Sequence, residues 1–332
     1  MKKLLSLMII LGSISIIGSE IESSQIEYKN NLWYQKTKNT PYTGKSISKY
    51  SNGQTRTELN FKDGIADGPS KGFYENGKLH SEGNFRNGEK IGIWTRYYES
   101  GKVSMTEEYI SGVCFIKEYY ENGKMSFERT MKDDKLNGPC SWYYKSGALK
   151  GKCTYTNDLL EGTETTYHEN GQVKSVYEYA NDMRNGSGKE YHENGTVYIE
   201  VAYKDDKKIG SYKEFYPSGK LLGEINYTNN MKNGAFKQYY ESGKKMIETT
   251  YKNDVLEGSF KEYFESEKIK ATSNYKSGKK EGNFKEYYEN GKTKLAATFK
   301  NDMLNGKVIS YDEKGKVESE ETFKDNELVP KK

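Results

Sequence analysis

The sequence predicts an all-β fold: an elongated, curled antiparallel sheet of about twelve tandem β-hairpins. Three observations predict it. A glycine ends a tyrosine-rich run at a near-constant spacing of 24 residues, and a second glycine precedes most of these by nine residues. The runs between the glycines are rich in Tyr, Phe, Thr, Val and Ile, which favour strands. The glycines that end the runs are Gly53, Gly77, Gly101, Gly123, Gly147, Gly171, Gly195, Gly219, Gly243, Gly291 and Gly315.

The composition limits the classes of protein to which the chain can belong. Of its 332 residues only 33% are hydrophobic and 30% are charged, a balance that is usual in disordered chains. Thirty tyrosines supply rings that can bury apolar area in place of aliphatic side chains, so we expect a folded chain. The net charge of +4 comes from interspersed acids and bases, which excludes the clustered basic face that a nucleic-acid partner requires.

Residues 1–19 have the features of a secretory signal peptide. Lys2 and Lys3 precede an apolar run at residues 4–17, and Gly18 and Ser19 are small residues suited to cleavage. The run is shorter than the ~20 residues that a transmembrane helix needs. We therefore predict an exported protein, in the periplasm, at the cell surface or secreted. An uncleaved membrane anchor is the alternative.

The remaining chain divides into three predicted parts. Residues 20–43 precede the first full repeat and form a lead-in or cap. Residues 44–326 are the tandem hairpin repeats, and residues 327–332 are a short tail.

Each repeat is predicted to be one hairpin with a tight turn at the recurring glycine. In six repeats this glycine follows Asn, as in Asn290-Gly291. Asn-Gly is typical of a two-residue type I′ turn, in which both central residues have positive φ. A looser polar turn, such as Asn253-Asp254, then leads to the next repeat.

A two-residue turn fixes which residues lie opposite each other in a hairpin. The resulting register puts an aromatic ring opposite the boundary glycine of its own repeat, where the ring can restore packing. It also sets opposite charges across the strands, which stabilises the pairing. The predicted cross-strand pairs are Lys117–Glu128, Cys140–Cys153, Lys189–Glu200, Lys213–Glu224 and Lys237–Glu248.

One repeat breaks the period. Only 22 residues separate Gly101 from Gly123, and Cys114 replaces the boundary glycine, opposite Met131 instead of a ring. We expect a shortened second turn near Ser111. The sequence leaves open whether the change kinks the sheet or is neutral.

Two aromatic columns precede each tight turn, and neighbouring residues of a strand point to opposite faces. The first column can pack along the sheet, offer an exposed platform to a protein, glycan or lipid partner, or do both. In the second column His168 and His192 replace Tyr; they are about 9.6 Å apart, two strand spacings, and are predicted to be aromatic replacements and not a metal site. The candidate binding residues of the first column are Tyr97, Tyr119, Tyr143, Tyr167, Tyr191, Tyr239, Tyr263, Tyr287 and Tyr311.

The chain has three cysteines, and two of them are candidates for a disulfide. Cys140 and Cys153 face each other in the predicted register, and disulfides persist in exported proteins. Two free thiols, or a bridge that involves Cys114, are the alternatives.

The sequence contains no motif for catalysis or cofactor binding. A glycine-rich phosphate loop, zinc-ligand spacing and a nucleophile elbow are all missing from it. The acidic residues recur with the repeat, as expected for solvated or cross-strand positions. We therefore predict a protein that is not an enzyme, with no catalytic residue, metal or cofactor.

The repeat resembles the MORN repeat family, and more closely its bacterial Tyr-Tyr-x-Asn-Gly-Lys variant. Residues 284–306 match that pattern closely, residues 40–44 resemble the start of such arrays, and the resemblance covers roughly residues 40–326. It implies an elongated antiparallel sheet of successive hairpins. Bacterial members include exported proteins and proteins labelled as antitoxin components.

Together these features predict a non-enzymatic exported repeat protein that offers a binding or scaffold surface to a protein or cell-envelope partner. The alternative is a lipid or membrane-surface binding module of MORN type. The sequence leaves the partner, the binding face and the oligomeric state open.

Overall fold

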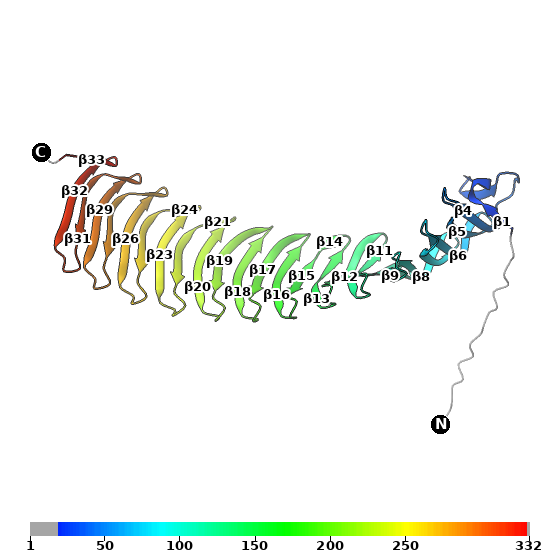
Figure 1. Ribbon diagram of the computed structural model, residues 1–332, viewed down its shortest axis with the longest axis horizontal. Helices are drawn as coiled ribbons and strands as arrows, with labels where there is room; N and C mark the ends of the chain where they lie inside the picture. Colours follow the sequence, from blue (N-terminus) through cyan, green and yellow to red (C-terminus); the bar gives the residue numbers. More distant parts are fainter. Residues whose placement is uncertain (1–18, 331–332) are drawn as a thin grey trace, which may run out of the picture. The chain divides into compact units, whose positions relative to one another are not determined.

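The computed structural model describes residues 19–330, and the chain divides into two compact units. Among the described residues, the first consists of residues 19–135 and 145–147, and the second of residues 136–144 and 148–330. In both units consecutive strands pair as antiparallel hairpins, which confirms the predicted all-β class (Figure 1). Between residues 19 and 330, no helix has both the length and the apolar character to cross a bilayer. The predicted signal peptide lies outside the described residues except for Ser19.

The first unit begins with a small apolar core over the first hairpins. Ile26, Tyr42 and Phe61 are buried together, with Trp33 packed against them. β1 pairs in parallel with β4, and β2 pairs with β3 in a separate two-stranded sheet. Its elements are β1 (Glu20–Glu22), η1 (Ser23–Gln25), β2 (Ile26–Lys29), β3 (Leu32–Gln35), β4 (Gly44–Lys49), β5 (Thr55–Lys62), β6 (Ile65–Phe73), β7 (Leu79–Arg86), β8 (Glu89–Tyr97), β9 (Val103–Ile110), β10 (Val113–Tyr119) and β11 (Met125–Lys132).

In the second unit the strands follow one another in chain order as a gently curved row (Figure 1). They are β12 (Lys135–Tyr143), β13 (Leu149–Thr156), β14 (Leu159–Leu160), β15 (Gly162–Tyr167), β16 (Val173–Ala180), β17 (Met183–Tyr191), β18 (Val197–Lys204), β19 (Lys207–Phe215), β20 (Leu221–Thr228), β21 (Met231–Lys232), β22 (Gly234–Tyr239), β23 (Lys245–Lys252), β24 (Val255–Leu256), β25 (Gly258–Tyr263), β26 (Ile269–Lys276), β27 (Lys279–Lys280), β28 (Gly282–Tyr287), β29 (Thr293–Lys300), β30 (Met303–Leu304), β31 (Gly306–Tyr311), β32 (Val317–Lys324) and β33 (Glu327–Leu328).

The turn at the recurring glycine is not the predicted two-residue type I′ turn. Gly291 N–H donates to the Tyr288 carbonyl at 2.8 Å, and Tyr288 N–H donates to the Lys292 carbonyl at 2.8 Å. Gly291 has a φ of 86°, whereas the φ of Asn290 is not positive. This hydrogen-bond pattern belongs to a three-residue loop that ends in a left-handed glycine.

The two-residue turns lie between repeats, where the sequence predicted a looser connection. Asn253 and Asp254 have φ values of 50° and 65°, and they join the paired residues Lys252 and Val255. Both central residues are therefore left-handed, as a type I′ turn requires. Asn and Asp tolerate this conformation because their short side chains bond locally.

The predicted cross-strand register is nevertheless confirmed. The longer loop moves the pairing by one residue beside the turn, and a bulge between Glu286 and Tyr287 moves it back in the repeat of Asn290. The same compensation recurs along the array. The confirmed pairs are Lys117–Glu128, Cys140–Cys153, Lys189–Glu200, Lys213–Glu224 and Lys237–Glu248.

A second bulge lies at the boundary glycine of the regular repeats. Tyr251 pairs with Leu256, but Glu248 pairs with Lys261, so one strand has two extra residues. Gly258 in this bulge has a φ of 84°, and no heavy atom lies within 4 Å of the position that a Cβ would take. Glycine is therefore required there by the backbone conformation and not by lack of space.

The 22-residue repeat lacks this bulge. β9 and β10 pair without interruption from Ile110–Val113 to Met105–Glu118. The predicted shortening of the turn is wrong, because Ser111 has a φ of 49° and begins an ordinary two-residue turn. The missing residues are the two of the bulge, so Cys114 occupies regular strand and needs no left-handed backbone.

Candidate binding surface

The second aromatic column joins most repeats to the next, although Phe264 in this column has no side-chain donor. Tyr240 Oη donates to the Tyr263 carbonyl at 2.8 Å, 23 residues further on. His168 and His192 occupy the same column, and each Nε2 lies 3.0 Å from the equivalent carbonyl of the next repeat. A ring N–H therefore replaces the phenol as donor, which accounts for both histidines without a metal. Among residues 19–330, no group of three or more His, Cys, Asp or Glu residues could hold a metal ion.

The Asn of the recurring Asn-Gly is a second link between repeats. Asn290 Oδ1 accepts a hydrogen bond from Lys292 N–H at 2.9 Å, and Asn290 Nδ2 donates to the Glu313 carbonyl at 2.9 Å. The side chain thus closes its own turn and holds the following one. This double role favours Asn without requiring a positive φ.

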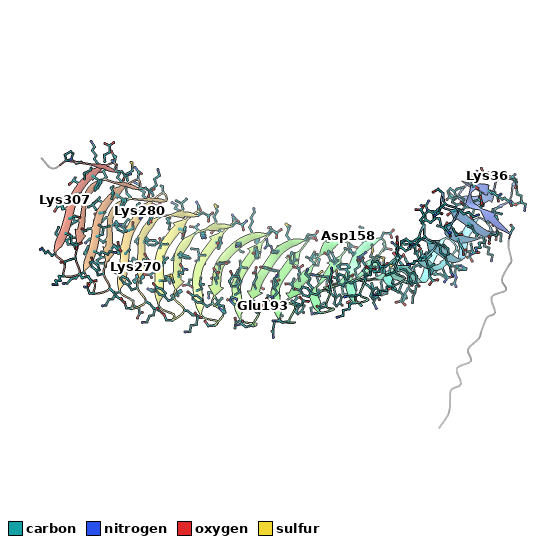
Figure 2. All side chains as sticks on the ribbon, in the orientation of Figure 1. Lys36, Asp158, Glu193, Lys270, Lys280 and Lys307 are labelled. Atoms are coloured by element: carbon teal, nitrogen blue, oxygen red, sulfur yellow. The ribbon has the colours of Figure 1, made fainter. Side chains whose placement is uncertain are left out.

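The two-residue turns form a third link, along the opposite edge of the sheet. Asp158 N–H donates to the Leu136 carbonyl at 2.9 Å, and Leu136 N–H donates to Asp158 Oδ1 at 2.7 Å. Figure 2 shows Asp158 on this edge and Glu193, from a glycine turn, on the other edge of the second unit. Polar residues that recur at both edges thus hold neighbouring repeats together, and the two sheet faces are the candidate binding surfaces.

One face carries the predicted tyrosine column and is called the tyrosine face here. All nine candidate tyrosines are half-buried. Tyr263 Oη donates to Glu248 Oε2 at 2.6 Å, and Tyr97 makes the same bond to Glu82 at 2.7 Å. Burial, followed by the bond to Glu248, raises the pKa of Tyr263 to about 12. The rings therefore present neutral, partly exposed phenols, and their role as a platform stays a prediction.

On the opposite face, called the ring-pair face here, the sequence predicted the ring opposite each boundary glycine but not its aromatic partner. The ring packs against that partner and not over the glycine, because no ring atom lies within 4 Å of the Cβ position of Gly258 or of its equivalents in these hairpins. Residues two positions after a boundary glycine meet the ring of the same hairpin edge-on, with centroid distances from 5.6 to 5.9 Å. The signal was visible as an aromatic column at the 24-residue period. The pairs are Tyr212–Tyr227, Phe236–Tyr251, Phe260–Tyr275 and Phe284–Phe299.

Cations cover most of these ring pairs. Lys208 Nζ lies 5.0 Å from the Tyr212 ring centroid, and Lys280 Nζ lies 5.1 Å from that of Phe284. Such contacts stabilise a fold by about 0.5–1 kcal/mol each at exposed sites. These lysines lie two residues before a boundary glycine. At the Phe260–Tyr275 pair that position is Leu256, so no lysine from it covers this ring pair.

Cys140 and Cys153 lie opposite each other, as predicted, and both are buried thiols in this structure. Their mutual hydrogen bond and then burial raise the pKa of Cys153. Cys114 is half-buried and faces Met131. The geometry brings the candidate pair together, and the bridge itself stays a prediction.

The fold and its surfaces define a tandem array of β-hairpin repeats. The MORN repeat variant matches well over half of the chain, and the chain belongs to this family. The matched residues are 66–87, 90–111, 116–133, 136–157, 160–181, 184–205, 208–229, 232–253, 256–277, 280–301 and 304–325.

Comparison with known proteins adds little beyond the family. No curated protein matches the chain. Among solved structures, a chain in the crystal structure of TcdB2-TccC3-Cdc42 is 10% identical with a TM-score of 0.18, over 85% of this chain and 17% of that one. A chain in that of TcdB2-TccC3-TEV is 11% identical with a TM-score of 0.17, over 83% and 18%. This chain thus spans less than a fifth of their length, and at these TM-scores the similarity identifies no shared fold.

Proposed function

We propose that the chain is a non-enzymatic, exported binding or scaffold protein that presents its sheet faces to a protein or cell-envelope partner. MORN repeats are in general protein- or membrane-binding modules. The observation that carries the proposal is that the edges and the faces of the sheet have different contacts within each repeat. Recurring polar residues at both edges bond to the next repeat, as Asn290 and Asp158 do, while aromatic columns on both faces stay half-buried.

The proposed export depends on residues 1–19, whose positive start, short apolar run and small residues favour cleavage by a signal peptidase. Fractionation of cells with sequencing of the mature amino terminus tests it. We expect a mature chain that begins close to Ser19 outside the cytoplasm. An intact amino terminus in the cytoplasm would refute the export proposal.

Site-specific photo-crosslinking tests the binding proposal. A photoreactive residue is placed at Tyr263 on the tyrosine face, at Phe260 on the ring-pair face, and at the exposed turn residue Glu265 as the control. We expect one of the two faces to capture a defined envelope component, and the turn to capture none. Equal capture from all three positions, or from none, would contradict the proposal, as would sedimentation of the chain with protein-free lipid vesicles alone.

A further inference from the structure

Small residues on the ring-pair face are usually compensated by a large neighbour. An aromatic atom of Trp142 lies 2.2 Å from the position that a Cβ on Gly151 would take, so the indole fills the space. Tyr177 fills the space beside Gly188 in the same way, at 2.6 Å. Close packing of this kind leaves no hollow in the surface.

At Gly223 this compensation is missing. The nearest atom to its Cβ position is the backbone carbonyl of Lys237 at 3.3 Å, and no side chain approaches within 4 Å. A hollow of about 270 Å³ lies here, between the ring pair Tyr212–Tyr227 and the next ring, Phe236. Glu214, Lys232 and Gln238 are among the other residues that line it, with Leu222, Glu224 and Ile225.

A second hollow repeats the first, two repeats further on. Its floor is Ala271 and Ser273, both small and both buried, and its volume is about 300 Å³. The equivalent rings line it: the pair Phe260–Tyr275 and the next ring, Phe284. In the repeat between the two hollows, Ile247 stands where Gly223 and Ala271 stand.

The rim of the second hollow is polar and balanced in charge. Glu262 Oε1 lies 2.6 Å from Lys270 Nζ, and Lys280 and Glu286 lie on the other side. The two lysines reach the hollow from opposite edges of the sheet (Figure 2). Because two glutamates and two lysines surround the three rings, the hollow favours neither a cationic nor an anionic ligand. They suit a ligand with flat apolar faces and hydroxyl-rich edges, which is the chemistry of a sugar ring.

The spacing of the hollows extends this argument to a polymer. Four strand steps separate Gly223 on β20 from Ala271 on β26, or roughly 19 Å at about 4.8 Å a step. We propose that the ring-pair face binds an uncharged glycan chain, with one sugar ring in each hollow. This inference depends on the proposed binding function and names its ligand class and face.

Filling the hollows tests the proposal without changing the fold. Gly223→Ile and Ala271→Ile install the residue that the array already carries at Ile247, and Gly223 has no positive φ to forbid a side chain. Ala235→Ile adds the same side chain at an exposed position on the opposite face and serves as the matched control. Circular dichroism and thermal melting should show that all three variants fold like the parent chain.

Calorimetry with cello- and chito-oligosaccharides, from disaccharide to hexasaccharide, provides the readout. We expect the affinity to increase with length as the ligand reaches the second hollow, each filled variant to lose about tenfold, and the control to lose nothing. Absence of binding by every oligosaccharide, or equal affinity in the filled variants, would overturn the proposal. If peptides selected from a library bind instead and lose affinity in the filled variants, the glycan assignment is wrong while the binding function stands.

Discussion

Glu267 stands where the other tight turns of the array have glycine, and it adopts a φ of 67°. Its N–H closes the turn by donating to the Phe264 carbonyl at 2.9 Å, so the left-handed conformation is imposed by the hairpin. That conformation costs an L-residue about 1–2 kcal/mol. Glycine avoids this cost but gives the unfolded chain about 0.5–1 kcal/mol of additional entropy. Glu267→Gly should therefore stabilise the hairpin of residues 258–275 by roughly 0.5–1 kcal/mol.

Hydrogen exchange followed by mass spectrometry is the appropriate assay, because repeat arrays open in parts and a global melt would dilute a local effect. The amides of β25 and β26 should exchange about two- to fivefold more slowly in Glu267→Gly, as 1.4 kcal/mol corresponds to a factor of ten. Peptides from distant repeats, such as β31, should be unchanged.

The neighbouring hairpin provides the reciprocal control. Gly243 has a φ of 87° in the equivalent turn, so Gly243→Glu should install the same strain and speed exchange of β22 and β23 by a similar factor. If Glu267→Gly left protection unchanged or weakened it, while Gly243→Glu had no effect, backbone strain would not be the reason for the glycine column.

Three further predictions follow from the site. In chain purified from an oxidising compartment, non-reducing peptide mapping should show Cys140 linked to Cys153 with Cys114 alkylated, and alkylation of all three would oppose the bridge. The pKa of Tyr263, raised from 10.0 to about 12, contributes stability that is fully present below pH 10 and is lost as the pH rises through 12, so tyrosinate absorbance should appear at higher pH in the folded than in the denatured chain. His168→Phe should lose about 1 kcal/mol of local stability by hydrogen exchange, while His168→Tyr should lose none.

The fold was predictable because the strand pattern and the turn residues are local features, and the same features recur about twelve times along the chain. The register was right although the turn was wrong, because the extra loop residue at Asn290 and the bulge beside Glu286 cancel. Within a single hairpin, Asn-Gly is compatible with the predicted two-residue turn and with the observed three-residue loop, so the sequence does not distinguish them. What selects Asn290 is its bond to Glu313 in the next repeat, and a hairpin considered alone does not contain that partner.

The tyrosine column was visible in the sequence because it lies beside an obvious landmark, the tight turn. On the ring-pair face only one ring of each pair was predicted. The pairing itself was not recognised, because it joins positions 15 residues apart, such as Phe260 and Tyr275, across the strands. The hollows are harder to predict from sequence, because each depends on two facing residues at once. Gly151 leaves no hollow since Trp142 fills the space beside it, whereas no large side chain fills the space beside Gly223.

The last prediction concerns the boundary-glycine position, where one repeat of the array has Cys114 in place of glycine. Gly258 is left-handed in a bulge, whereas Cys114 lies in uninterrupted strand. Gly258→Cys should therefore cost about 1–2 kcal/mol of local stability, while Cys114→Gly should cost about 0.5–1 kcal/mol through chain entropy.

Hydrogen exchange in β25 and in β10 measures the two effects separately. Both exchanges should destabilise, since each residue suits its own backbone and not that of the other. If Gly258→Cys were neutral, the left-handed bulge would not explain the glycine column, since the open space at the Cβ position gives no steric reason for glycine there. A neutral result would also undo the explanation of the 22-residue repeat, because that explanation depends on the same two bulge residues.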